Sequence, residues 1–284
     1  MAIFFRPPLA IRRPRIALLC LILMTALPQL CAASSRSIVY SKEWIHGVVA
    51  HVVTIDLNDL DVRLTPAIAR KGVGSSEPFG SIVSRTRPTA AITGAFFDTR
   101  SLQPVGDVMV DGEMVCRGVV GTAIGIGWNN EVEFIPTKRG KLSDWSLYQS
   151  VIVGGPVLVS GGMVAVNPWD EGFRDSRLFR KGIRTAVGVT WSNKLLFVTT
   201  AKPVYLSHLA KVMRSLGARN AATLDGGGST ALYYRGRYIS RPNRRLTTLL
   251  LAYDNHSDYE QARSGLLPRR PVRSATAAGP VTKG

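Results

Sequence analysis

The segment Leu224-Asp225-Gly226-Gly227-Gly228-Ser229-Thr230 places a carboxylate before three glycines and two hydroxyls. The small apolar residues 221–224 before it and the aromatic-rich residues 231–234 after it favour β-strands. We therefore predict that Asp225 ends a buried strand and faces a turn with almost no side chains. Glycine lets the backbone approach a ligand closely, and successive free N–H groups can bind an anion. The alternative from these residues alone is a plain turn in which Asp225 has no chemical role.

The glycine-rich turn differs from two common nucleotide-binding motifs. It lacks the Gly-Lys-Ser/Thr ending of a P-loop, and no second glycine pair with a following helix makes it a dinucleotide-binding turn. A carboxylate beside an anion-binding turn would repel the anion, unless the ligand also offers a sugar hydroxyl, a proton or a developing positive charge. The absence of both sequence patterns excludes nucleotide binding through a P-loop or a dinucleotide-binding turn.

The N-terminus has the three parts of a secretory signal. Four arginines precede an apolar run at 16–27, and small residues follow at 31–33. A membrane-spanning helix needs about 20 apolar residues, so this run is short for a span. We predict a signal peptide over 1–33, a periplasmic or secreted protein, and no stable membrane span after cleavage. An uncleaved anchor is the alternative.

Cysteine usage agrees with export to a bacterial envelope. Cys20 and Cys31 would leave with the signal peptide, and Cys116 would then be alone. No internal disulfide is then possible, which fits a bacterial periplasm. No histidine lies near Cys116 in the sequence, so we interpret it as a packed residue rather than a nucleophile.

The chain is strongly basic, with 36 Lys and Arg against 19 Asp and Glu and a formal net charge of +17. The arginines are scattered, without an RNA-binding signature or a basic helix, so we expect no nucleic-acid partner. An exported basic protein meets anionic envelope polymers instead. Residues 36–255 have the length of one ordinary domain. Residues 256–284, rich in proline, arginine and small side chains, are predicted to be a disordered basic tail.

Short strands separated by turn residues dominate the domain. Two helices are expected, at 78–87 and 205–216, and the polar and aromatic segment 168–182 is expected to be a long functional surface loop. The pattern predicts an α+β fold: a strand-rich mixed sheet with many hairpins and a few flanking helices in a single domain. The predicted hairpins turn at Asn58-Asp59, Asp111-Gly112, Asn129-Asn130, Ser192-Asn193 and Arg235-Gly236.

Several glycine-rich strand ends could converge on one concave face. Arg184 opens an otherwise apolar strand and is a natural bidentate partner for an anion, with a salt bridge to Asp175 as the alternative. Asp98 and Asp225 form a candidate carboxylate pair for glycosyl chemistry. The alternative for Asp98 is a turn cap.

Four motifs, in this order, resemble the phosphodiester glycosidase family. They are Thr-Gly-Ala-Phe-Phe-Asp (93–98), Gly-Gly-Pro-Val-Leu (154–158), Arg-Thr-Ala-Val-Gly (184–188) and Leu-Asp-Gly-Gly-Gly-Ser (224–229). The resemblance covers about 44–253. It implies an exported glycosidase that cleaves the glycosidic bond of a sugar-1-phosphate diester, releasing a free sugar and a phosphomonoester, with a link to exopolysaccharide or envelope glycan metabolism.

The resemblance implies three catalytic residues, Asp225, Asp98 and Arg184. Threonine stands at 93 and 223, where the family usually has asparagine, so substrate fit or rate is expected to differ. The substrate-binding residues expected from the four motifs and the adjoining Thr230 are Thr93, Gly94, Phe97, Gly154, Gly155, Thr185, Gly226, Gly227, Gly228, Ser229 and Thr230.

Two mechanisms and two functions stay open. Asp225 would give retention as a nucleophile and inversion as a base on water. The four histidines fall in no motif, so neither a histidine triad nor a zinc site is expected. No cofactor is expected, although a divalent cation on Asp98 and Asp225 is an alternative. The second function is a non-catalytic periplasmic protein that binds a glycan or phosphate in the same cavity.

Overall fold

The computed structural model describes residues 36–118, 120–138 and 141–268. The predicted signal peptide at 1–33 and residues 269–284 of the predicted tail lie outside this range. Within the described residues, no helix is long and apolar enough to cross a membrane.

The largest sheet has seven strands that pair antiparallel. In sheet order they are β1 (Ile38–Ile45), β2 (Val48–Asp56), β13 (Lys194–Thr200), β12 (Thr185–Thr190), β14 (Ala218–Leu224), β10 (Val157–Ser160) and β11 (Met163–Val164). In β2, Val53 and Ile55 join one buried cluster, whereas Ala50 and Val52 join another. Because successive strand residues point to opposite faces, this sheet is buried on both sides.

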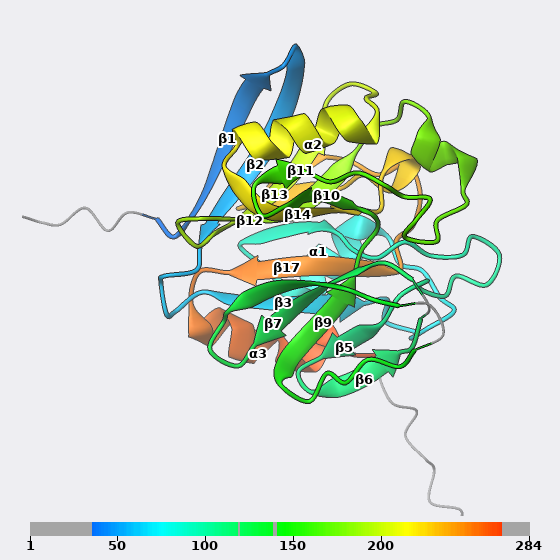
Figure 1. The fold of residues 1–284 in the computed structure, drawn as a ribbon. Helices are drawn as coiled ribbons and strands as arrows, with labels where there is room; N and C mark the ends of the chain where they lie inside the picture. Colours follow the sequence, from blue (N-terminus) through cyan, green and yellow to red (C-terminus); the bar gives the residue numbers. More distant parts are fainter. Residues whose placement is uncertain (1–35, 119, 139–140, 269–284) are drawn as a thin grey trace, which may run out of the picture. The chain divides into compact units, whose positions relative to one another are not determined.

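Two five-stranded sheets complete the β-structure (Figure 1). The second sheet runs β16 (Arg237–Ser240), β15 (Leu232–Tyr234), β4 (Ala90–Thr93), β17 (Thr248–Tyr253) and β3 (Arg63–Ile68). The third runs β6 (Glu113–Cys116), β5 (Val108–Val110), β9 (Tyr148–Val153), β7 (Thr122–Gly127) and β8 (Val132–Pro136). The largest buried cluster takes residues from all three sheets, so they share one core.

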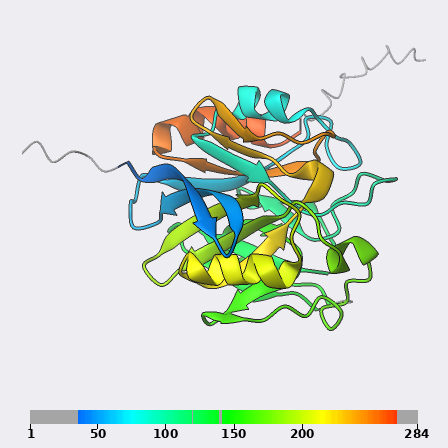
Figure 2. The ribbon, with the colours of Figure 1, turned by 90° about the horizontal axis from the view of Figure 1, so that it is seen from above.

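The α-helices are α1 (Phe79–Thr86), α2 (Leu206–Ser215) and α3 (His256–Leu266), and the 3-10 helices are η1 (Ser176–Phe179) and η2 (Gly227–Ser229). Leu209, Val212 and Met213 are fully buried at helical spacing and pack α2 on the seven-stranded sheet. The other two α-helices contact each other, and α3 also contacts β3 and β17. Figure 2 shows α2 and this helix pair on opposite sides of the sheets.

The predicted α+β class is confirmed, as are both predicted helices. Four predicted hairpins are also confirmed, at Asp111-Gly112, Asn129-Asn130, Ser192-Asn193 and Arg235-Gly236. The hairpin at Asn58-Asp59 is wrong, because β2 and β3 belong to different sheets. Both edges of β2 are already taken by β1 and β13, so β3 pairs with the buried β17 instead.

The prediction that the disordered tail begins at 256 is also wrong. Residues 256–266 form α3. Asn255 caps its N-terminus, because its side-chain oxygen accepts a hydrogen bond from the Asp258 N–H at 2.8 Å. Tyr259, Ala262 and Leu266 are buried, at the spacing of one helix face. This apolar stripe is short and lies among charged residues, so the basic composition of the segment concealed it.

Candidate functional site

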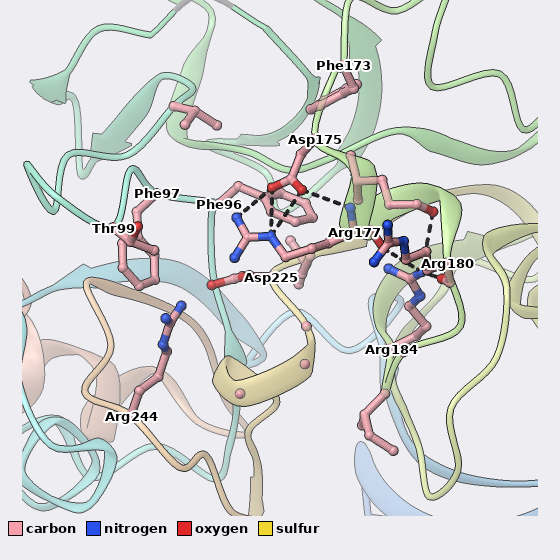
Figure 3. A pocket seen from close by; sticks show the side chains of 18 of the residues that line it. Phe96, Phe97, Thr99, Phe173, Asp175, Arg177, Arg180, Arg184, Asp225 and Arg244 are labelled. Carbon is pink, nitrogen blue, oxygen red and sulfur yellow. Dashed lines mark hydrogen bonds and ion pairs between the residues drawn. The ribbon is translucent and has the colours of Figure 1, made fainter.

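A cavity of about 480 Å³ lies at the end of β14 (Figure 3). Four segments form most of it: the turn 224–228, the segment after β4, the loop 172–184 and the pair Asn243-Arg244; Val120 completes the lining. The aromatic side chains of Phe96, Phe97 and Phe173 supply apolar wall, and arginines supply much of the polar wall. A cavity of this size, with apolar walls and a few convergent charged groups, is typical of a small-molecule site.

The glycine-rich turn is held by hydrogen bonds to two neighbouring segments. The Asp225 N–H donates to the Gly94 carbonyl at 3.1 Å, and the Gly227 N–H donates to the Ile183 carbonyl at 2.8 Å. Gly227 has a φ of 56°, a left-handed conformation that favours glycine. Because the Gly227 N–H is already used inside the protein, this part of the turn is not the free anion-binding nest that the sequence predicted.

Asp225 directly follows the last residue of β14, as predicted, and its carboxyl group faces the cavity between Arg177 and Arg244 (Figure 3). Burial raises the pKa of Asp225 to about 6, although both arginines favour its charged form. Ser229 Oγ lies close enough to lower this pKa further, but it does not reach the geometry of a hydrogen bond. A carboxyl group with this pKa exchanges its proton near neutral pH, as a general base must.

Arg184 also lines the cavity, but most of its donors serve the protein itself. Its Nε donates to the Val204 carbonyl at 3.1 Å. Its Nη2 donates to the carbonyls of Arg177 at 3.2 Å and Leu178 at 3.3 Å, and also to that of Arg180. Of the three guanidinium nitrogens of Arg184, only Nη1 makes no hydrogen bond within the described residues. The side chain therefore ties the loop 172–184 to the start of β12, and its predicted bidentate hold on an anion is not available.

The predicted alternative for Arg184, a salt bridge to Asp175, is wrong. Asp175 instead accepts two hydrogen bonds from Arg177 Nε, at 2.9 and 3.0 Å. These hydrogen bonds lower the pKa of Asp175, so it lines the cavity as a carboxylate. The sequence predicts a functional loop here and offers Asp175 only as a partner for Arg184. It does not assign Asp175 or Arg177 to the site, because nothing local in the pattern distinguishes them from neighbouring charges.

Arg244 is a third cavity residue that the sequence did not predict. Its guanidinium carbon lies 5.4 Å from the centre of the Phe97 ring, and it forms no ion pair within the described residues. It belongs to the basic segment 241–245. The sequence of this segment by itself is typical of an ordinary solvent-exposed surface. Only the fold brings this run beside Asp225.

Asp98 does not line the cavity, so the predicted pairing of Asp98 with Asp225 is wrong. Asp98 is exposed and accepts hydrogen bonds from the N–H groups of Arg100 at 2.9 Å and Ser101 at 2.7 Å. The hydrogen bonds from Ser101 and Arg100 lower the pKa of Asp98. Its observed role is the turn cap that the sequence analysis kept as an alternative.

The other predicted site residues divide into two groups. Phe97, Gly226, Gly227 and Gly228 line the cavity, whereas Thr93, Gly94, Gly154, Gly155, Thr185, Ser229 and Thr230 do not. The second group packs behind it. A Cβ on Gly155 would lie 2.1 Å from Thr223 Oγ1 and 2.3 Å from the Phe96 ring. These glycines therefore allow close packing of the strand ends and do not themselves face a ligand.

No group of three or more His, Cys, Asp or Glu side chains within the described residues could hold a metal ion. The alternative of a divalent cation shared by Asp98 and Asp225 therefore has no ligand cluster to support it. The charged residues that line the cavity are five arginines, a lysine and two aspartates. This set suits an anionic ligand.

Comparison with known proteins agrees with the fold and the motifs. Residues 86–253 match the family model described as phosphodiester glycosidase. No curated protein matches this chain. Among solved structures, this chain is similar to the catalytic domain of zebrafish N-acetylglucosamine-1-phosphodiester alpha-N-acetylglucosaminidase, auto-inhibited by its pro-peptide. It has a TM-score of 0.64 and 20% identity, over 78% of this chain and 85% of that chain.

Two bacterial structures are also similar. A hypothetical protein from Synechocystis has a TM-score of 0.62 and 17% identity, over 77% of this chain and 62% of that chain. A putative exported protein from Burkholderia pseudomallei has a TM-score of 0.54 and 15% identity, over 72% of this chain and 74% of that chain. At these identities the three structures establish a shared fold only. The evidence for family membership is the match of the sequence to the family model.

Proposed function

The chain belongs to the phosphodiester glycosidase family, and we propose that it hydrolyses the glycosidic bond of a sugar-1-phosphate diester. The products are a free sugar and a phosphomonoester. The observation that carries this proposal is Asp225, a carboxyl group with a pKa of about 6 that faces a cavity beside two arginines. We further propose that the protein is exported and acts in the periplasm, on an envelope or capsular glycan or a smaller diester.

The chemical step needs few protein groups. Water adds to the anomeric carbon, and the bond from this carbon to the phosphate oxygen breaks, leaving the electron pair on the phosphate. A phosphate is a good leaving group, so the reaction does not require a strong general acid. Arg244 lies beside Asp225, forms no ion pair within the described residues and would hold the charge of the phosphate. Arg177 also lies there, but it is paired with Asp175. Phe97 and Phe173 supply apolar wall for the sugar ring.

Asp225 has two possible roles at the anomeric carbon. As a base it takes a proton from the attacking water and the sugar is released with inversion. As a nucleophile it forms a glycosyl ester that water then cleaves, and the sugar is released with retention. Asp175 is the other carboxylate of the cavity, but its pairing with Arg177 favours the ionised form and makes it a poor acid. The anomer first released, read by NMR, distinguishes the two roles.

The test is release of free sugar from a panel of sugar-1-phosphate diesters by the wild type and by Asp225→Asn. Asparagine keeps the shape of the side chain but can neither accept the proton nor form the ester. Turnover should fall about a thousandfold or more, while the diester still binds. Equal release by both proteins would remove Asp225 from the reaction.

A non-catalytic glycan-binding or phosphate-binding protein is the second candidate function. The observation that favours it is Thr223, whose buried hydroxyl makes no hydrogen bond within the described residues. Threonine stands here where the family usually has asparagine, so an amide is lost without a compensating contact. This candidate predicts measurable binding of the diesters and no sugar release by the wild type, and any robust turnover contradicts it.

A further inference from the structure

A second groove of about 560 Å³ adjoins the cavity, and Asn243 and Arg244 line both. The Asn243 N–H donates to the Gly228 carbonyl at 2.9 Å. This contact fixes the boundary residues against the glycine-rich turn that carries Asp225. A ligand held at Asp225 can therefore continue past Arg244 into the groove without leaving the protein surface.

The second groove is basic and contains no carboxylate among its lining residues. Its three arginines are Arg241, Arg244 and Arg245, and none of them forms an ion pair within the described residues. Arg245 donates to the Ser76 carbonyl, at 3.2 Å from Nε and 2.9 Å from Nη2. The charge of all three arginines is therefore open to an anionic ligand.

An aromatic side chain forms part of the groove and is held in place by packing. The Tyr238 ring contacts the Phe79 ring edge-on at 5.5 Å between centroids, and the guanidinium of Arg241 lies 4.8 Å from its centre. Gly80 leaves room for the Tyr238 hydroxyl, because a Cβ there would lie 3.3 Å from it. Aromatic rings supply contact area for sugars at little cost in conformational entropy.

We propose that this groove is a subsite for the part of the substrate attached to the phosphate, and that this part carries further negative charge. The substrate class is then an anionic glycan with phosphate-linked sugars rather than a small diester. This inference rests on the proposed function, since Arg244 must hold the cleaved phosphate for the chain to continue in this direction. Tyr238 packs against a sugar, and Arg241 and Arg245 bind the next anionic group.

The test compares a diester with one phosphate and a methyl aglycone with a short oligomer of phosphate-linked sugars. In the wild type, kcat/KM for the oligomer should exceed that for the single diester about tenfold. In Arg241→Ala/Arg245→Ala this preference should disappear, while kcat/KM for the single diester changes less than about twofold. Each exposed ion pair is worth at most about fivefold, so two give a difference of this size. The double variant Lys211→Ala/Arg214→Ala removes the same charge from α2, outside both cavities, and should keep the preference.

A binding measurement separates failure of this inference from failure of the proposed function. Calorimetric affinities for both ligands are measured on the same proteins, without turnover. Weaker binding of the oligomer alone in the groove variant supports the subsite even if no diester is cleaved. Equal preference in wild type and variant, or equal losses for both ligands, overturns it. Arg241→Ala alone makes the same comparison if the double variant unfolds, since Arg241 makes no hydrogen bond within the described residues.

Discussion

Two opposing effects set the pKa of Asp225, and this pKa sets the pH range in which its carboxyl group is ionised. Burial favours the neutral acid, whereas Arg244 and Arg177 favour the carboxylate. The result is a pKa near 6, above the ordinary value for aspartate. The group is therefore ionised at neutral pH but accepts a proton more readily than an exposed aspartate, as a base in the reaction requires.

This balance predicts the pH dependence of the reaction. Activity needs the ionised form, so kcat/KM should be constant above pH about 7 and fall about tenfold per unit below an apparent pKa of about 6. Arg244→Ala removes one positive charge that favours the carboxylate, so the apparent pKa should rise. The measurement is kcat/KM from pH 4 to 9 on a neutral-aglycone diester. An acid limb near the ordinary pKa of aspartate would show that burial does not control Asp225.

The elements around the cavity differ in how far local sequence could predict them. The end of β14 just before Asp225 was predictable, because a small apolar run before glycines is a local signal. The convergence of Arg177 and Arg244 on that carboxylate was not, because each lies in a basic segment with no pattern of its own. The Asp98 pairing failed for a related reason: the turn at 98–102 satisfies that carboxylate locally.

The Arg184 side chain holds the loop 172–184 against the start of β12 by hydrogen bonds to backbone carbonyls. This role predicts the effect of replacing Arg184. A lysine keeps the charge but cannot reach four carbonyls with a planar fork, so Arg184→Lys should loosen the loop that carries Arg177. We expect kcat/KM to fall about tenfold to a hundredfold, with faster tryptic cleavage at Arg174, Arg177 and Arg180. Arg214→Lys on α2 is the matched control. Wild-type rates of proteolysis with lost activity would assign Arg184 to direct contact with substrate instead.

At the scale of the whole domain, α3 contacts two different five-stranded sheets. The Tyr259 ring packs edge-on against Tyr253 of β17, with 5.8 Å between centroids. Its hydroxyl accepts from Gln149 Nε2 of β9 at 3.0 Å. Arg263 of the same helix pairs with Asp111, in the turn between β5 and β6. The helix is therefore part of the core, although its composition resembles that of a solvated tail.

This placement predicts that α3 is needed for stability. Tyr259 is 2% exposed, so Tyr259→Ala removes a buried ring and should lower the free energy of unfolding by about 3–5 kcal/mol. Tyr205→Ala, at a tyrosine that is 49% exposed, is the matched control and should cost less than about 1 kcal/mol. Both are measured by urea denaturation of the protein. A chain ending at Asn255 should be unstable as well, because Tyr253 would lose its cover. If instead that shorter chain unfolds at the same urea concentration as the full protein, the helix contributes nothing and the segment behaves as the tail that its composition suggests.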